Sequence, residues 1–155
     1  MPDNVDRAAA RHYEVRRTIA APATTVWELL TDADGYADWN EAVISIEGPI
    51  RQGERVRLVS IADPKRTFKL KVDEMIAPTR MVWSDGMPLG LFTGRRTYTI
   101  TDAGAGRCEF SMTERFSGPL AGLITKAIPD LTGSFDLFAD GLKAAAERAA
   151  TTEQI

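Results

Sequence analysis

The spacing of apolar residues changes abruptly near residue 117, and this change limits the possible folds more than any other feature. Between residues 43 and 116, several segments place an apolar residue at every second position, as in a sheet with one buried face. From about residue 120 to residue 149, apolar residues recur at helical spacing. Six such strands, and a seventh over residues 12–19, cannot bury their apolar face alone. We therefore expect the sheet to curl around the C-terminal helix.

Two short helices are expected between the first two strands. Pro22 suits the first turn of a helix, where its missing N–H costs nothing. This helix should end near Thr31. Its apolar face is formed by Val26, Trp27, Leu29 and Leu30. Tyr36 and Trp39, three residues apart, indicate a second short helix.

The boundaries of the domain follow from the ends of these patterns. Residues 12–149 are predicted to form a single α+β domain, with flexible termini at 1–11 and 150–155. Residues 85–88 are predicted to form a loop, because of their glycine and proline. Pro129 is expected to kink the C-terminal helix, or to split it and stand in the first turn of the second piece.

Composition narrows the functional classes. The 155 residues carry a net charge of -3, whereas a non-specific nucleic-acid binder normally has a basic surplus. One cysteine and one histidine cannot build a zinc finger or a His-rich zinc site. We expect no nucleic-acid partner, no metal site and no cofactor. The start is polar and no apolar run reaches the roughly 18 residues of a membrane span, so a cytoplasmic protein is expected.

Three stretches resemble a known superfamily: residues 21–27 (APATTVW), 38–40 (DWN) and 113–118 (TERFSG). They are similar to the START-like superfamily, also called SRPBCC or helix-grip, which includes the birch-pollen-allergen fold. The nearest branch is the polyketide cyclase/dehydrase and lipid-transport group. The resemblance implies a helix-grip fold, in which a seven-stranded curved antiparallel sheet wraps around a long C-terminal helix and encloses an apolar cavity for small hydrophobic ligands.

Two departures from that branch stand out. Glu41 occupies a position where the branch often has proline, and Arg96 occupies one where many members have histidine on the cavity side. No catalytic set of the cyclase members can be matched residue by residue, so we assign no catalytic residue.

Arg96 and Glu114 are charged, yet each is in phase with the apolar side of its strand. Their strands should be hairpin neighbours joined near Gly104, which places the two side chains within reach of a cross-strand ion pair. They could form a polar pole that grips a carboxylate, phenol or carbonyl of a ligand. Alternatively, they form a structural salt bridge at the rim, or a bulge turns one of them outward.

Aromatic residues supply the candidate cavity wall. Trp39 and Trp83 are pocket candidates, and some of Phe92, Phe135 and Phe138 should also line the cavity. Cys108 falls on the apolar side of its strand and is expected to be an inert buried thiol.

These residues predict binding or transport of a small hydrophobic molecule, such as a lipid, a polyketide or an aromatic compound. One alternative is a polyketide cyclase/dehydratase-like enzyme, in which the Arg96–Glu114 pair moves protons. Another is a co-chaperone or protein-interaction module, which needs an exposed apolar patch and a filled core. The ligand's identity and the oligomeric state are left open.

Overall fold

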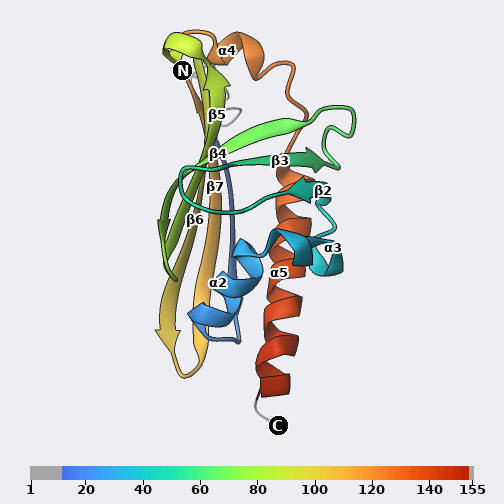
Figure 1. Cartoon of the computed structure of the whole chain (residues 1–155), viewed down its shortest axis with the longest axis vertical. Coiled ribbons are helices and arrows are strands. Elements are labelled where there is room, and N and C mark those ends of the chain that lie inside the picture. The colour runs from blue at the N-terminus through green and yellow to red at the C-terminus, as the bar shows by residue number, and fades with distance from the viewer. Residues whose placement is uncertain (1–11, 154–155) are drawn as a thin grey trace, which may run out of the picture.

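The computed structural model of the chain describes residues 12–153, which form one curled sheet and a long helix (Figure 1). The sheet has seven antiparallel strands in the order β1-β7-β6-β5-β4-β3-β2, so consecutive strands from β2 to β7 are neighbours and β1 joins β7. The strands are β1 (His12–Ile19), β2 (Val43–Glu47), β3 (Arg55–Ser60), β4 (Phe68–Ile76), β5 (Arg80–Met87), β6 (Phe92–Gly104) and β7 (Arg107–Ser117).

The helices lie where the sequence places them, with one exception. Two short helices follow the first strand, and the long helix closes the fold. The helical elements are α2 (Ala23–Thr31), η1 (Ala33–Gly35), α3 (Tyr36–Trp39), η2 (Pro88–Gly90), α4 (Ala121–Ile124) and α5 (Thr132–Glu153). The predicted helix-grip α+β fold is therefore confirmed. Within residues 12–153, no helix is long and apolar enough to cross a membrane.

The exception is the C-terminal helix, which begins about twelve residues later than its apolar stripe suggests. The carboxylate of Asp130 accepts hydrogen bonds from the N–H and the hydroxyl of Thr132, at 3.0 and 2.8 Å, and so caps the helix there. Pro129 lies outside the helix, and only the single turn of α4 is helical between residues 120 and 131. The expected helix over that stretch is wrong.

Two smaller boundaries also differ. Asp85, Gly86 and Met87 pair in register with β6, so β5 extends to Met87 and the predicted loop begins only at Pro88. At the C-terminus of the described chain, α5 continues to Glu153. Residues 150–153, which were predicted to be a flexible tail, are therefore helical. The predicted flexibility of residues 1–11, 154 and 155 lies outside the described residues.

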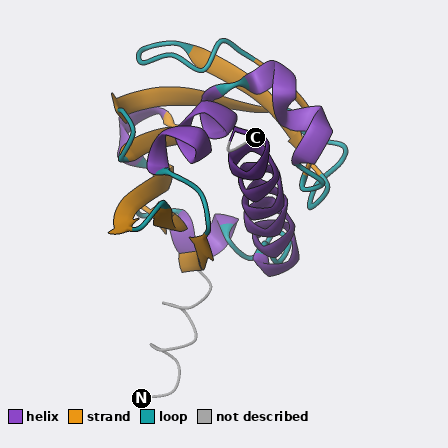
Figure 2. Ribbon diagram, turned by 90° about the horizontal axis from the view of Figure 1, so that it is seen from below, coloured by secondary structure: helices purple, strands orange, loops and turns teal. Residues whose placement is uncertain are grey.

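The sheet wraps one side of α5 (Figure 2). The register of β4 against β5 shifts between Val72 and Glu74, and that of β2 against β3 shifts between Val43 and Ser45. Such bulges bend a strand and increase its twist. They lie in the part of the sheet that curls toward the helix.

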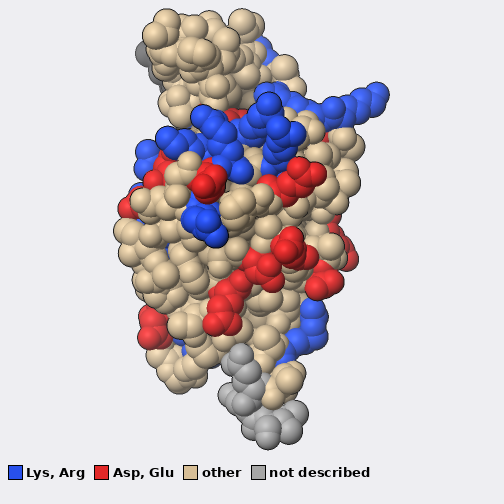
Figure 3. All heavy atoms as spheres, in the orientation of Figure 1, with Lys and Arg blue, Asp and Glu red and all other residues tan. Residues whose placement is uncertain are grey.

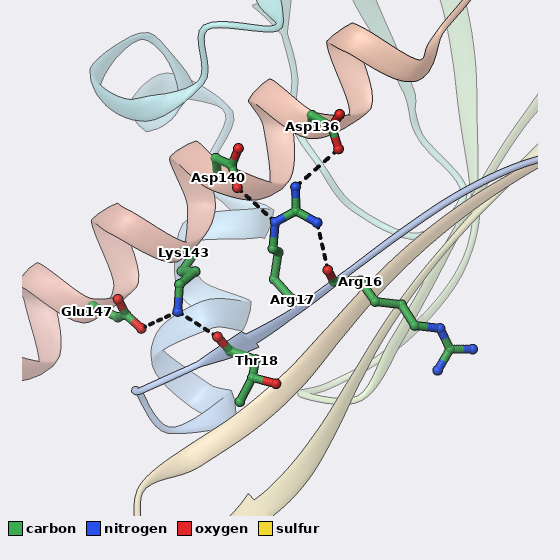
Figure 4. Close-up of polar contacts among 7 residues, drawn as sticks. All are labelled: Arg16, Arg17, Thr18, Asp136, Asp140, Lys143 and Glu147. Atoms are coloured by element: carbon green, nitrogen blue, oxygen red, sulfur yellow. Dashed lines mark hydrogen bonds and ion pairs between the residues drawn. The ribbon is translucent and has the colours of Figure 1, made fainter.

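Polar contacts fasten α5 to the edge strand β1 (Figure 4). Arg17 donates hydrogen bonds to Asp136 and Asp140, at 3.1 and 2.8 Å. One turn further along, the Lys143 ammonium donates to the carbonyl oxygen of Thr18 at 2.7 Å. These contacts lie outside the apolar interior and fix the helix at the open edge of the sheet.

Along the C-terminal half of α5 the interior is closely packed. Leu142 and Ala146 are fully buried, together with Leu30 of α2 and Phe110 of β7. At Gly141 the backbone of α3 approaches so closely that a Cβ would lie 2.2 Å from the carbonyl oxygen of Trp39. A side chain at Gly141 would therefore push α3 away from α5.

Candidate functional site

A cavity lies between the concave face of the sheet and the first turns of α5. The volume of this cavity is about 100 Å³, whereas one water molecule needs about 10–15 Å³ on the same measure. Its floor is formed by β3 to β7, with Leu58, Leu70 and Met112 among the apolar contributors. The cavity is therefore large enough for a compact ligand or several waters.

Six of the seven residues predicted for the site line this cavity: Trp83, Phe92, Arg96, Glu114, Phe135 and Phe138. Trp39 does not. Its ring packs 4.9 Å from that of Tyr36 and 5.5 Å from that of Phe138, measured between centroids, within the closely packed region beside α5. The apolar position of Trp39 was predicted from its spacing, but that spacing gives no information on which part of the interior the short helix α3 covers.

Arg96 and Glu114 stand directly opposite each other on β6 and β7. The Arg96 Nε donates to the Glu114 carboxylate at 2.9 Å. Their side chains are only 20% and 11% exposed, and the Arg96 guanidinium lies 5.0 Å from the centroid of the Phe135 ring. The predicted ion pair is therefore formed in the cavity wall, and no bulge turns either residue outward.

Burial and pairing act in opposite directions on this ion pair. Burial raises the pKa of the Glu114 carboxyl, and the nearby Arg96 charge only partly offsets it. For Arg96, burial is the largest single influence and lowers the pKa, but the interactions with Glu114 and Tyr98 together outweigh it and the net shift is upward. The guanidinium stays charged, whereas the carboxyl is easier to protonate than an exposed glutamate.

A second carboxylate approaches the pair at Gly94. A Cβ at Gly94 would lie 2.9 Å from an Asp85 carboxylate oxygen and 3.4 Å from the Oε1 of Glu114. Glycine at this position thus leaves open the space that the two carboxylates share. Burial raises the pKa of Asp85, with Arg66 and Arg96 opposing the shift.

Asp85 was missed by the sequence analysis, although the signal was present. It continues the alternation of Met81 and Trp83, but the adjacent glycine and proline favoured a loop. Within the described residues, Asp85 has neither an ion pair nor a side-chain hydrogen bond. It therefore contributes an unpaired acceptor to the cavity wall.

Burial keeps two further groups neutral at physiological pH: Tyr98, which neighbours Arg96, and Cys108, which lies outside the cavity lining. Burial raises the pKa of Tyr98 to about 12, although the neighbouring Arg96 charge opposes the shift. Tyr98 therefore remains a neutral phenol at physiological pH. Burial also raises the pKa of the Cys108 thiol, which agrees with the prediction that Cys108 is no nucleophile.

The segment before α5 covers one side of the cavity. Ile128, Pro129 and Leu131 line it, followed by Ser134 in the first turn of the helix. None of these four residues was among the predicted site residues. The early end of α4 at Ile124 and the cap at Asp130 leave this irregular segment between the two helices, over the cavity.

Comparison with known families identifies the chain. The model of the family described as polyketide cyclase / dehydrase and lipid transport matches residues 10–147. The chain belongs to this family. A comparison with curated proteins finds no match. The family description covers both catalysis and transport, so membership agrees with the predicted fold and leaves the reaction or the cargo open.

Solved structures with the fold of this family resemble the chain over most of its length. A START superfamily protein from Mycobacterium smegmatis has a TM-score of 0.65 at 13% identity, covering 90% of this chain and 99% of the other. A norcoclaurine synthase point mutant from Thalictrum flavum, in complex with a transition-state analogue, has a TM-score of 0.67 at 14% identity, with coverages of 94% and 96%. These likenesses confirm the START-like fold.

Proposed function

We propose that the protein binds a compact, mostly apolar molecule that carries one polar, oxygen-containing group. The observation that supports this most strongly is the buried ion pair in the wall of a mostly apolar cavity. A buried charged pair is costly to desolvate, and replacing it by apolar residues is often neutral or stabilising. A role in orienting a ligand accounts for its presence in this wall.

The hydrogen bonds of Arg96 leave donors free for such a group. Within the described residues, the bond from Nε to Glu114 is the one well-formed side-chain hydrogen bond of Arg96, and the Tyr98 hydroxyl is its other polar neighbour. A guanidinium has five N–H donors in a planar arrangement that suits a carboxylate, a phenolate or a carbonyl. The ring of Phe135 under the guanidinium holds that plane in place. We therefore assign the ligand's acceptor oxygen to Arg96.

The space beside Gly94 indicates that the same ligand also carries a hydrogen-bond donor. Asp85 and Glu114 both approach it, and carboxylates accept hydrogen bonds from hydroxyl groups. A hydroxylated aromatic or polyketide fragment, with a carbonyl or phenol next to a hydroxyl, can bind both to Arg96 and to the two carboxylates. A simple hydrocarbon chain can bind to neither.

The test is a thermal-shift screen and native mass spectrometry of the purified protein against fatty acids, sterols, flavonoids and polyketides. For a compound that binds, Arg96→Lys is expected to weaken Kd roughly tenfold or more, because one charge-assisted planar contact is lost. Arg95→Lys is the matched control, since Arg95 is the adjacent residue on the opposite, exposed face. Equal losses in both variants, or no binding by any compound, contradict the proposal.

An enzymatic role is the second candidate, favoured by the raised pKa of Glu114 beside Asp85. A carboxyl with a raised pKa is more readily protonated and can both donate and accept a proton, as a dehydration or cyclisation requires. Glu114→Gln is then expected to retain ligand binding but lose turnover of a bound polyketide. If turnover persists in that variant, Glu114 is not the acid or base.

A further inference from the structure

The outer face of the sheet carries a row of basic residues that the ligand cavity does not use. Cross-strand pairing places Arg115 beside Arg95, Arg95 beside Ser84, Ser84 beside Lys71, and Lys71 beside Arg55. All four basic residues are exposed. The adjacent row adds Lys69 and Arg57, which are paired with each other and also exposed. We call these six residues the cationic row.

This arrangement is unfavourable in the isolated protein. Like charges directly opposite each other destabilise a sheet. Within residues 12–153, no member of the cationic row forms an ion pair, although Glu47 lies opposite Arg57. The chain as a whole carries a net charge of -3, so the cationic row is a local basic surface on an acidic protein. An anionic partner on this face relieves the repulsion.

An uncharged apolar tip projects at the same end of the molecule. It consists of η2 and α4 with their flanking residues, and residues 86–94 and 116–125 contain no charged side chain. Its exposed apolar residues are Met87, Leu89, Leu91 and Leu123, of which Leu89 is 96% and Leu123 is 69% exposed. The N–H of Leu120 donates to the carbonyl oxygen of Leu91 at 2.9 Å and joins the two halves of the tip.

Figure 3 shows this tip as an uncharged knob at the top of the molecule, with basic side chains gathered directly beneath it. On β6, Arg95 lies three residues from Phe92, which corresponds to about 10 Å along a strand. Phe92, Phe116 and Ile124 connect the base of the tip to the cavity lining. The apolar tip, the cationic row and the cavity are therefore next to one another.

We propose that this end of the protein docks on an anionic lipid surface. The apolar tip enters the headgroup region, and the cationic row binds the negative surface potential, which attracts each nearby Lys or Arg. Neither feature alone is decisive, but a lipid surface is the partner that uses both. A nucleic acid has phosphates for the cationic row and offers nothing to an aliphatic tip. The inference goes beyond the proposed function, because docking does not depend on what the cavity holds.

Vesicle flotation with the ligand-free 155-residue chain tests this proposal. We expect binding to vesicles of equal parts phosphatidylcholine and phosphatidylglycerol, little binding to phosphatidylcholine alone, and weaker binding as salt is raised. Lys71→Gln combined with Arg95→Gln is expected to lower partitioning roughly tenfold or more. The matched control combines Arg51→Gln and Arg107→Gln, which remove two exposed positive charges outside the row.

The tip has its own pair of variants. Leu89→Glu is expected to abolish flotation without changing stability, because Leu89 is almost fully exposed. The control is Ile76→Glu, which adds the same charge at a residue that is 50% exposed but lies outside the tip. This variant should float nearly as well as the wild type, because it keeps the apolar tip. No binding to anionic vesicles by the wild type, equal losses in Leu89→Glu and Ile76→Glu, or binding to duplex DNA instead of vesicles each overturns the proposal.

Discussion

The two halves of α5 meet the same sheet in different ways. Toward the C-terminus, Leu142, Ala146 and Ala150 are buried against α2 and the sheet, and small side chains let the elements approach closely. Toward the N-terminus, Leu131 and Phe135 border a cavity with a buried ion pair. One end is therefore closely packed, and the other end leaves a cavity beside the helix.

The largest expected difference between the ends is in the cost of truncating a leucine. Leu142→Ala should lower the free energy of unfolding by about 2–5 kcal/mol, because it opens a void in a closely packed region. Leu131→Ala should cost no more than about 1–2 kcal/mol, since Leu131 is only partly buried and already borders empty space. Urea unfolding measures both values, and equal costs would show that the two ends are packed alike.

The next effect concerns the ion pair at the open end. Arg96→Met should lower the free energy of unfolding by about 2–3 kcal/mol at neutral pH, because it leaves Glu114 buried without a partner. Burial then raises the pKa of Glu114 further above its unfolded value of about 4.3. The deprotonated form is the one disfavoured in the folded state. The penalty is therefore absent below the unfolded pKa and grows as pH rises through the folded pKa.

This pH dependence is checked by measuring the free energy of unfolding of the wild type and of Arg96→Met from acidic to neutral pH. The two stability curves should converge at low pH and separate as pH rises. A constant separation would mean that the cost is lost packing against Phe135 rather than an unpaired carboxylate.

A smaller effect separates two glycines of the same helix. Gly141→Ala should cost about 1–2 kcal/mol net, because its Cβ would meet the Trp39 carbonyl, although alanine favours the helix. Gly133→Ala has no heavy atom within 4 Å of the added carbon and should gain about 0.5–1 kcal/mol. Thermal unfolding distinguishes them, and a gain in both variants would show that the close contact of α3 with α5 does not form.

The sequence predicts the sheet well, because strand alternation and hairpin counting are local. Counting back from the turn near Gly104 placed Arg96 opposite Glu114 or one pair away, and the structure has the two residues directly opposite each other. The prediction fails at Asp85, which keeps the alternation of the strand, because the adjacent glycine and the nearby proline indicated a loop. The apolar spacing after residue 119 predicted a helix that starts too early. A proline and the cap at Asp130, rather than apolar spacing, decide where α5 starts.

Trp39 shows a different limit. Its burial follows from its spacing, but its distance from the cavity depends on how α3 packs against Gly141, which is a tertiary contact. The interaction-module alternative stays a prediction, which a pull-down from native cell extract tests.

Crystals pressurised with xenon test the central claim most directly, because apolar cavities bind this gas. The account predicts xenon density among Trp83, Phe92 and Phe135, and none beside Leu142. An open end without xenon, in which side chains fill the space between the sheet and α5, would contradict it.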